Sequence, residues 1–416
     1  MAPLNAADYI ICATRGTKMT AKSTAPSIQD IDRWRSQTKG CNEVLHFNNA
    51  GAALMPDTVY DTVSQHLDLE RRIGAYEASD NQAQSLQNVY TSIANMLRAQ
   101  PDEIALIENA TRAWDMAFYS INFKPGDRIL TAKSEYASNY IAYLQIAGKH
   151  GVQIEVIPDD EHGQVDVQAL KNAIDDRVKL IAITHVPTQG GLINPAEQIG
   201  KVAREAGVLY LLDACQSVGQ LDLDVNALGC DMLSATGRKY LRGPRGTGFL
   251  YVKKDVIESL EPPFLDLHAA DWTGPQEFAI RKDARRFENW ESYVAGKLGL
   301  GAAVDYAMSI GLANIQSRVT DLAATLRARL STIPHVTVKD KGANKCGIVT
   351  FVKDNLSVDA IKMQLRTQKI NVSASRMESA RLDMQERNET AFVRASVHYY
   401  NTEAEIDRFC EAVAAL

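Results

Sequence analysis

One lysine of this chain lies in a short segment that could bind an anionic group and react with an aldehyde. Lys239 occurs in the stretch Thr236-Gly-Arg-Lys-Tyr-Leu-Arg-Gly-Pro-Arg-Gly-Thr-Gly248, whose glycines permit tight turns and close approach to a ligand. The cations Arg238, Arg242 and Arg245 raise the local positive potential, which favours the neutral form of the lysine amine. A neutral amine can form a Schiff base with an aldehyde. Taken alone, such a segment is more typical of a solvated basic loop.

A carboxylate at the end of a buried strand changes this interpretation. The run Val208-Leu-Tyr-Leu-Leu-Asp213 is almost wholly apolar until it ends in an aspartate, and Gln216 follows three residues later. In α/β sheets, residues at the carboxyl ends of parallel strands face the ligand site. An aspartate that pairs with a protonated pyridine nitrogen, together with a Schiff-base lysine, is what pyridoxal phosphate (PLP) chemistry requires. The two segments together therefore predict a PLP site.

The spacing of these residues resembles that of a known enzyme family. Asp213-x-x-Gln216 followed by Thr236-x-x-Lys239 is similar to the class V aminotransferase and cysteine desulfurase-like family of fold-type I PLP enzymes. The resemblance extends from about Phe47 to the C-terminus. It implies pyridoxal 5'-phosphate as the cofactor and an α/β fold of the PLP-dependent transferase type I. That fold has a large domain with a mainly parallel seven-stranded sheet and a smaller α+β C-terminal domain.

The resemblance implies a role for each polar residue of the predicted cofactor site. Lys239 would hold the cofactor and then act as base or acid at Cα, while Asp213 would keep the pyridine nitrogen protonated. Gln216 would hydrogen-bond the ring oxygen, and Tyr136 would stack on the ring, where many relatives have a histidine. The remaining cofactor contacts are expected from Asn109, Ala110, Thr111, Arg112, Thr188, Thr236 and Arg238.

The resemblance also implies three substrate-binding residues. Arg394 matches the arginine that binds the substrate carboxylate, and its planar guanidinium suits a bidentate contact. A surface salt bridge is the alternative for this side chain. Arg376 is a second candidate for an anion contact. Asn49, in the loop Asn48-Asn-Ala-Gly51, would lie at the mouth of the active site, although the same loop could be an ordinary turn.

Two departures from the family pattern bear on the phosphate contact and on the reaction. Glu291 stands where we expect a threonine that the partner subunit donates to the phosphate. No cysteine occurs between Cys346 and Cys410, where desulfurases that pass sulfur on a protein carry a persulfide-forming thiol. A dedicated sulfur-mobilising desulfurase is therefore not expected.

We predict instead an enzyme that acts on an α-amino acid through a Cα carbanion, by β-elimination with cleavage of a C–S or C–X bond. Transamination by a class V aminotransferase and epimerisation or racemisation of an amino acid are alternatives, since they use the same carbanion. A PLP-free binding module of the same fold is the non-enzymatic alternative.

Alternating strands and helices must position these residues. Between residues 103 and 252, strand-like apolar runs alternate with helical patterns, which predicts a parallel, doubly wound sheet. Side chains that follow such strands converge at one edge of the sheet. Five candidates occupy these places, namely Thr111, Tyr136, Thr188, Asp213 and Lys239.

The expected organisation is a large PLP-binding domain over residues 45–295 and a small domain from residues 28–44 and 296–416. Residues 1–27, rich in Ala, Ser, Thr and Lys, are expected to form a flexible leader, with a transit-like segment or an early start codon as alternatives. The family resemblance implies a homodimer with its active site at the interface and a small amino-acid substrate.

Composition narrows the range of partners. Among 416 residues, 45% are hydrophobic and 23% are charged, as in ordinary globular proteins. A net charge of −6 argues against nucleic acid and anionic membranes as partners, and no apolar run approaches the roughly 20 residues of a membrane span. The six cysteines are dispersed without a Cys-x-x-Cys pair, so we expect no metal cluster and a cytoplasmic protein with reduced thiols.

Overall fold

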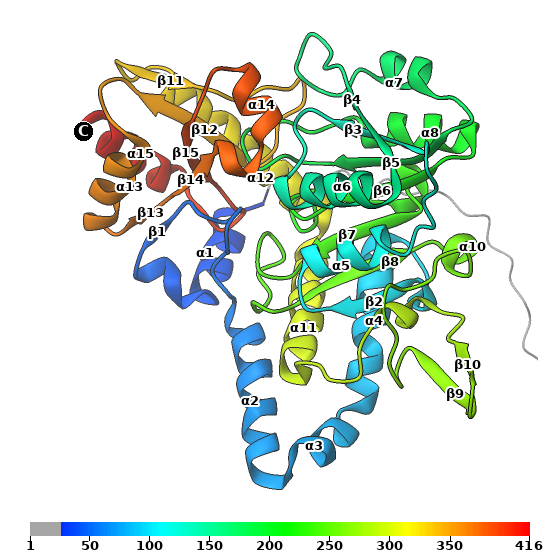
Figure 1. Cartoon of the computed structure of the whole chain (residues 1–416). Coiled ribbons are helices and arrows are strands. Elements are labelled where there is room, and N and C mark those ends of the chain that lie inside the picture. Colours follow the sequence, from blue (N-terminus) through cyan, green and yellow to red (C-terminus); the bar gives the residue numbers. More distant parts are fainter. Residues whose placement is uncertain (1–25) are drawn as a thin grey trace, which may run out of the picture.

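A seven-stranded sheet forms the centre of the larger part of the molecule (Figure 1). Each neighbouring pair of strands is parallel except at β8, which runs antiparallel to both β2 and β7. This confirms the predicted α/β fold with a mainly parallel seven-stranded sheet. In spatial order the strands are β2 (Ile104–Ile107), β8 (Gly248–Val252), β7 (Met232–Thr236), β6 (Leu209–Asp213), β5 (Val178–Thr184), β3 (Arg128–Ala132) and β4 (Gln153–Ile157).

The computed structural model describes residues 26–416. The predicted leader of residues 1–27 therefore lies outside the described residues except for its last two positions. Among the residues described, no single helix is long and apolar enough to cross a membrane, and only one pair of consecutive helices, bent by 79°, meets the test of length and composition together.

Both faces of the central sheet are buried, which explains the continuous apolar runs in the sequence. On β6, Tyr210 and Leu212 contribute to one hydrophobic cluster and Leu211 to another, because successive side chains point to opposite faces. The helices that connect or follow these strands are α5 (Ala110–Phe118), α6 (Ala137–His150), α7 (Val167–Ala173), α8 (Ala196–Ala206), α9 (Val225–Leu228) and α10 (Lys254–Ile257).

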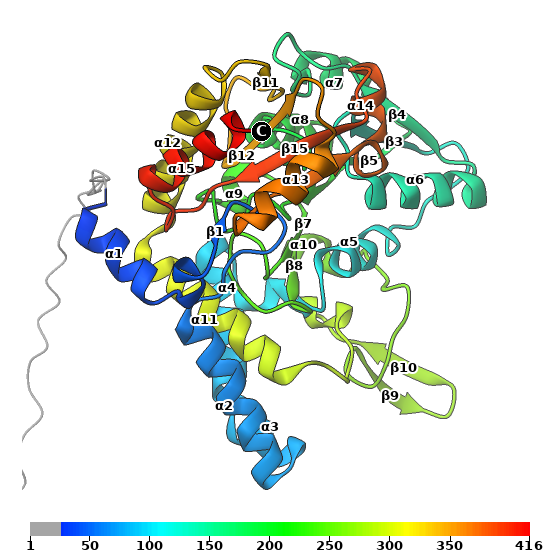
Figure 2. The ribbon, with the colours of Figure 1, turned by 90° about the vertical axis from the view of Figure 1, so that its left-hand side faces the viewer.

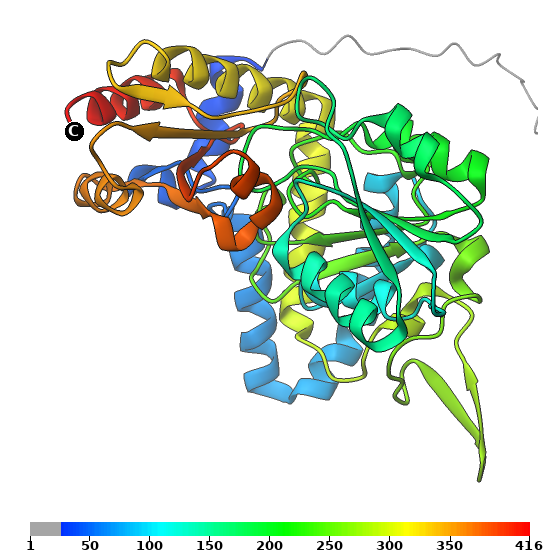
Figure 3. The same cartoon turned by 45° about the horizontal axis from the view of Figure 1, so that its top comes forward.

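A second, four-stranded antiparallel sheet forms the C-terminal layer (Figure 3). Its strands in spatial order are β11 (Val336–Val338), β12 (Ile348–Lys353), β15 (Ala391–Ser396) and β14 (Ser373–Arg376). The helices α12 (Leu312–Leu330), α13 (Val358–Thr367) and α15 (Glu403–Ala414) pack with it. This arrangement confirms a smaller α+β part. The short strand β1 (Leu45–His46) pairs with β13 (Ile370–Asn371), so the start of the family-like region contacts this layer.

Long helices outside both sheets form the lower part of the molecule in Figure 2. Helix α11 (Val294–Ile310) packs against α2 (Asp57–Ile73) and α4 (Ala83–Leu97), while α3 (Ala75–Asn81) joins the latter two. The N-terminal α1 (Ile28–Ser36) begins at Ser27, whose hydroxyl accepts a hydrogen bond from the Asp30 N–H. Short 3₁₀ turns complete the set: η1 (Lys39–Asn42), η2 (Pro101–Glu103), η3 (Ala284–Phe287) and η4 (Met377–Ser379).

One hairpin and one short helix have no clear signal in the sequence. Strands β9 (Ala270–Gly274) and β10 (Glu277–Ile280) form a hairpin that projects from the body of the molecule (Figure 2). Its aromatic side chains are exposed rather than packed, 81% for Trp272 and 60% for Phe278, so no alternation of buried and exposed residues marks it. The helix α14 (Arg381–Glu386) is only six residues long, too short for a helical period to be recognised.

Candidate active site

A cavity of about 400 Å³ lies at the carboxyl edge of the central sheet. It is bounded by the residues that follow β2, β3, β5, β6 and β7, which is where ligands bind in doubly wound sheets. Nine of the residues singled out in the sequence line it, namely Asn109, Ala110, Thr111, Tyr136, Thr188, Asp213, Gln216, Arg238 and Lys239.

Asp213 presents a buried carboxylate to this cavity. It is the last residue of β6, and its side chain accepts hydrogen bonds from the Asn139 side-chain amide at 3.0 Å and from the Cys215 backbone N–H at 2.9 Å. Burial raises the pKa of the Asp213 carboxyl, while these two donors and the nearby Lys239 act in the opposite direction. The arrangement fixes the orientation of a carboxylate in a site that largely excludes water.

Lys239 enters the cavity from the turn that follows β7. Its Nζ atom lies 3.2 Å from the Cys215 Sγ atom, so an amine and a thiol share one side of the site. The turn packs tightly against the loop after β6. Gly219, with φ of 89°, has no room for a side chain, because a Cβ atom there would lie 2.4 Å from the carbonyl carbon of Tyr240.

One end of the cavity carries the groups that suit a phosphate. Helix α5 begins here, and the Asn109 side chain accepts a hydrogen bond from the Arg112 N–H at 3.0 Å. The other N–H groups of the first turn have no acceptor within the helix, and the helix dipole favours an anion beside them. Arg238 adds a positive charge, and its guanidinium donates to the Thr236 hydroxyl at 3.1 Å.

Thr236 and Arg112 do not themselves line this cavity. Thr236 lies behind Arg238, through which it contacts the site. The guanidinium of Arg112 stacks on the Phe264 ring, 4.6 Å from its centroid, and faces a neighbouring hollow that Glu291 also lines. Arg242 points away from the cavity and donates to Thr38 and Tyr399.

Gln216 and Thr188 line two further parts of the cavity wall. The Gln216 side chain donates to the Ala50 carbonyl at 3.2 Å, and its buried Oε1 atom has no hydrogen-bond partner in the described structure. After β5, the predicted Thr188 lines the cavity, whereas the amide of the neighbouring Gln189 donates to Asp383 at 3.3 Å. Thr188 is therefore the better placed of the two.

Arg394 is buried beside the cavity rather than paired on the surface. Its side chain lies on β15, is 7% exposed and donates to the Thr188 hydroxyl and, at 3.5 Å, to the Thr188 carbonyl. Its Nε atom has no hydrogen-bond partner among the described residues. Burial lowers the pKa of this guanidinium, and Arg238 adds to the effect. A buried cation with an unsatisfied donor is well suited to bind an anion.

Two predicted substrate contacts are not brought to the cavity. Asn49 is fully buried, donates to the Ser396 carbonyl at 2.7 Å and accepts from the Tyr400 hydroxyl, so it ties its loop to the C-terminal layer. Arg376 is exposed and forms an ion pair with Asp359 at 2.5 Å. Both side chains are satisfied by partners that sequence spacing could not reveal.

Five polar residues that were not predicted as site residues also line the cavity, one of them Glu108 directly after β2. Cys215 and Asn139 lie within segments that the motifs already marked, and a thiol between Asp213 and Gln216 was a signal available in the sequence. Thr184, at the end of β5, was hidden within a buried strand. Arg245 is the one further arginine of the Lys239 segment that faces the cavity.

These residues fit pyridoxal phosphate. The cavity combines an amine, a buried carboxylate, an unsatisfied amide oxygen at Gln216 and a helix N-terminus with an adjacent arginine. The amine matches an aldehyde, the carboxylate matches a pyridine nitrogen, and the helix N-terminus with its arginine matches a phosphate. Over residues 26–416 no group of three or more His, Cys, Asp or Glu side chains is arranged to hold a metal ion.

The family is shown by comparison with known proteins. The model of the aminotransferase class-V family matches residues 45–409. The chain therefore belongs to this family, which confirms the resemblance predicted from the motifs. It is an enzyme of the family, and its cofactor is pyridoxal phosphate.

Individual relatives narrow the comparison. A probable cysteine desulfurase of Methanothermobacter thermautotrophicus is 32% identical over 345 residues, 82% of this chain and 86% of the relative. The apo structure of a cysteine desulfurase from Thermococcus onnurineus NA1 matches with a TM-score of 0.86 at 25% identity, over 92% of this chain and 97% of that chain. The cystine C–S lyase C-DES, in complex with its product cysteine persulfide, matches with a TM-score of 0.82 at 23% identity, over 91% and 99% of the two chains, and so shares the fold.

Proposed function

We propose that this enzyme cleaves the C–S bond of an α-amino acid by β-elimination and releases the sulfur as a small molecule. The observation that carries the proposal is the position of Arg394, a buried arginine without a carboxylate partner among the described residues. It lies directly behind Thr188, to which it donates, and Thr188 lines the cavity that contains Lys239 and Asp213. The desulfurase and C–S lyase names of the relatives support sulfur-containing amino acids as substrates.

Arg394 would bind the substrate carboxylate. Its Nε and remaining N–H groups can form a bidentate contact with a carboxylate, and Thr188 already fixes the guanidinium from the other side. With the carboxylate held beside Thr188, the amino group and Cα of the substrate would point towards Lys239, which lines the same cavity as Thr188. Positioning of this kind lowers the barrier by reducing the search for a reactive geometry.

Lys239 would move the proton. Bound pyridoxal phosphate supplies an electron sink that acidifies the Cα–H bond of the attached amino acid. The Lys239 amine, next to the Cys215 thiol, would accept the Cα proton, and the β-sulfur would leave with the bonding electron pair. Asp213 would keep a negative charge beside the ring nitrogen, and Tyr136, at the start of α6, would cover the ring.

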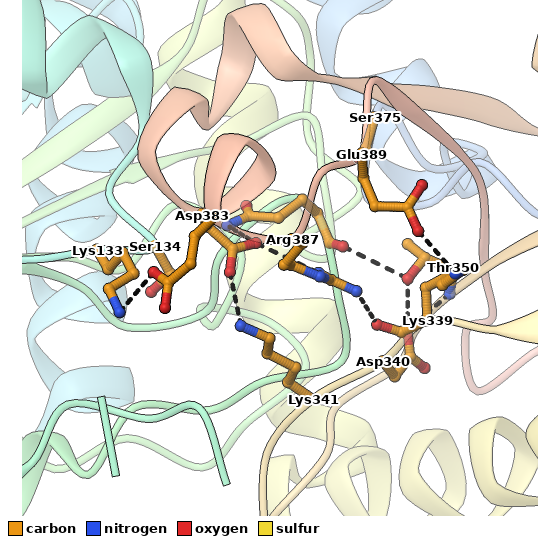
Figure 4. A network of polar contacts seen from close by, with 12 residues as sticks. Lys133, Ser134, Lys339, Asp340, Lys341, Thr350, Ser375, Asp383, Arg387 and Glu389 are labelled. Carbon is orange, nitrogen blue, oxygen red and sulfur yellow. Dashed lines mark hydrogen bonds and ion pairs between the residues drawn. The ribbon is translucent and has the colours of Figure 1, made fainter. Parts of the chain in front are cut away.

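The segment that carries a sulfur-accepting cysteine in protein-to-protein desulfurases is built differently here. It contains α14 and no thiol, and Figure 4 shows it fixed by charged contacts to the rest of the chain. Asp383 pairs with Lys341 at 3.0 Å and Arg387 at 3.3 Å, and Glu386 pairs with Lys133 at 2.6 Å. A fixed segment without a nucleophile supports release of sulfide or a persulfide to solution.

We also propose a cytoplasmic homodimer, with a large domain over residues 45–295 and a small domain from residues 28–44 and 296–416. The exposed aromatic rings of the β9–β10 hairpin support a partner surface, since Trp272 and Phe278 have no covering layer in the described chain. Arg112, which stacks on Phe264, and Glu291 line the hollow next to the phosphate end, where a second subunit would complete the site.

The test is product analysis with L-cystine and L-cysteine on purified holoprotein. Elimination predicts equimolar keto acid and ammonia, together with sulfide or a persulfide, and no product from Lys239→Ala. Keto acid without ammonia would instead indicate transamination, and conversion between enantiomers would indicate racemisation. Either of these results, without a sulfur product, overturns the proposal.

A further inference from the structure

A second carboxylate lies directly behind Asp213. Glu135, just after β3, is 3% exposed, and Asn139 on α6 stands between the two acids. One amide nitrogen, Asn139 Nδ2, donates to Asp213 at 3.0 Å and to Glu135 at 2.9 Å. The three residues therefore form a buried chain that runs from the cavity wall into the interior.

Four hydrogen-bond donors hold the Glu135 carboxylate. Its Oε1 atom accepts from the Tyr136 N–H at 2.8 Å and from the Thr184 hydroxyl, in addition to Asn139. Its Oε2 atom accepts from the Thr131 hydroxyl at 3.1 Å. No lysine, arginine or histidine side chain forms an ion pair with it in the described chain. The negative charge is thus stabilised by dipoles and is not neutralised by a cation.

The charge of Glu135 can change near neutral pH. Burial raises the pKa of its carboxyl to about 7, and Asp213 adds to the rise, whereas the hydrogen bonds from Thr184 and Asn139 oppose it. The other titratable groups beside it are the phenols Tyr143 and Tyr210, both fully buried, whose pKa burial holds well above the usual range. Above neutral pH Glu135 is therefore the charged member of this group besides Asp213.

We propose that Asn139 and Glu135 form a positioning pair that orients the Asp213 carboxylate towards the ring nitrogen of the bound cofactor and keeps that nitrogen protonated. This inference rests on the proposed role of Asp213. The Asn139 amide fixes one carboxylate oxygen of Asp213, and the Cys215 N–H fixes the other. The second negative charge behind them raises the proton affinity of Asp213 and the nitrogen together.

Glu135→Gln is a well-matched variant, because it removes the charge with little change of shape. The amide oxygen can keep the three donors at Oε1, and the amide nitrogen can donate to the Thr131 hydroxyl, which accepts as readily as it donates. Ser234→Ala is the control. Ser234 pairs with Asp213 in the register of β6 and β7 and is fully buried, and its side-chain hydroxyl has no hydrogen-bond partner among the described residues.

The experiment is ¹⁵N NMR of holoprotein that contains pyridoxal phosphate labelled at its ring nitrogen, recorded as the pH is raised. The chemical shift reports the proton on that nitrogen directly and does not depend on turnover. Loss of Glu135 charge should lower the midpoint of deprotonation by about one unit, a tenfold weaker hold on the proton. Asn139→Ala should lower the midpoint similarly, and Ser234→Ala should leave it unchanged. Glu135→Asp keeps the charge, so its midpoint should lie close to that of wild type.

Identical midpoints in wild type, Glu135→Gln and Asn139→Ala would overturn the inference. Circular dichroism identifies a variant that does not fold. If either Glu135→Gln or Asn139→Ala fails to fold, the midpoint of the remaining variant is compared with that of wild type. Failure of wild type to bind the labelled cofactor in this cavity would overturn the proposed function instead. The two failures are therefore distinguishable.

Discussion

The amine of Lys239 lies 3.2 Å from the thiol sulfur of Cys215, at a cavity wall that also includes the Asp213 carboxylate. Burial raises the pKa of the Cys215 thiol, and the Lys239 and Arg238 cations oppose this rise. The thiol is therefore protonated at neutral pH and can donate to, or accept from, the lysine. A cofactor attached to Lys239 would therefore lie next to the Cys215 thiol.

This relationship predicts that the cofactor protects Cys215 from alkylation. Pyridoxal phosphate attached to Lys239 would occupy the space beside the thiol, so iodoacetamide should modify Cys215 at least about tenfold more slowly in holoprotein than in apoprotein. Peptide mass spectrometry measures the modified fraction. Cys41 is partly buried and does not line the cavity, so it serves as the internal control and should react equally in both forms. Equal rates at Cys215 would show that the cofactor lies elsewhere.

Replacement of Arg394 should weaken substrate use without loss of cofactor. Arg394→Gln removes the charge that is buried beside Thr188. A charge-assisted hydrogen bond contributes about 1.5–3 kcal/mol, so kcat/KM should fall about 10- to 100-fold, chiefly through KM. Steady-state kinetics and cofactor absorbance measure the two effects. Arg376→Gln, which breaks only the exposed pair with Asp359, should leave both unchanged. If Arg376→Gln lowered kcat/KM more than Arg394→Gln, Arg376 and not Arg394 would be the residue that binds the substrate carboxylate.

Asp383 should contribute to stability as the centre of the contacts in Figure 4. Its carboxylate is 4% exposed and is shared by Lys341 and Arg387, while Gln189 donates to it at 3.3 Å. Asp383→Ala leaves these donors without an acceptor, which should lower the free energy of unfolding by about 3 kcal/mol. Denaturant unfolding of the apoprotein measures the change. Glu386→Gln, at an exposed pair, should cost less than about 1 kcal/mol.

His185 should make the enzyme less stable in acid. Burial lowers the pKa of His185 to about 4, below the ordinary value of about 6.5, so the unfolded chain binds a proton that the folded chain excludes. The stability contributed by neutral His185 is complete above pH about 6.5 and is lost towards pH 4, up to about 3 kcal/mol. His185→Gln should remove this loss. The raised pKa of Glu135 acts with the opposite sign, but equally in both proteins, so it cancels in the difference. Parallel curves of stability against pH would contradict the prediction.

Exposed rings of the β9–β10 hairpin should stabilise the proposed dimer. Trp272→Ser together with Phe278→Ser removes two side chains that are 81% and 60% exposed in one subunit. Sedimentation velocity should show a dimer for wild type and a shift to monomer for the double variant. Ile141→Ser, at a 65% exposed position on α6, is the control and should remain dimeric. A monomeric wild type would contradict the proposal.

The sequence was most informative where a buried strand ends in a polar residue. Asp213 and Lys239 could be placed because each follows an apolar run, and parallel strands bring such positions to one edge. Most other strands of the central sheet could be recognised from their apolar runs alone. Asn109, predicted as a cofactor contact, caps helix α5 and lines the cavity.

Contacts between distant segments could not be predicted in this way. Asn139 and Asp213 are separated by 74 residues, and only the fold shows that one amide joins Asp213 to Glu135. Arg376 and Asn49 are also predicted to bind substrate, yet their partners lie in other elements of the structure. The hairpin at Trp272 is exposed on both faces and therefore lacks the alternation that marks a strand.

The central claim is that Lys239 anchors pyridoxal phosphate in the cavity at the end of β7. Borohydride reduction of the holoprotein, followed by peptide mass spectrometry, tests it most directly because the reduced bond cannot be hydrolysed. We expect one cofactor adduct, on the peptide that contains Lys239, and none in Lys239→Ala treated in parallel. An adduct on a different lysine in wild type, or no adduct on protein loaded with the cofactor, would contradict the account.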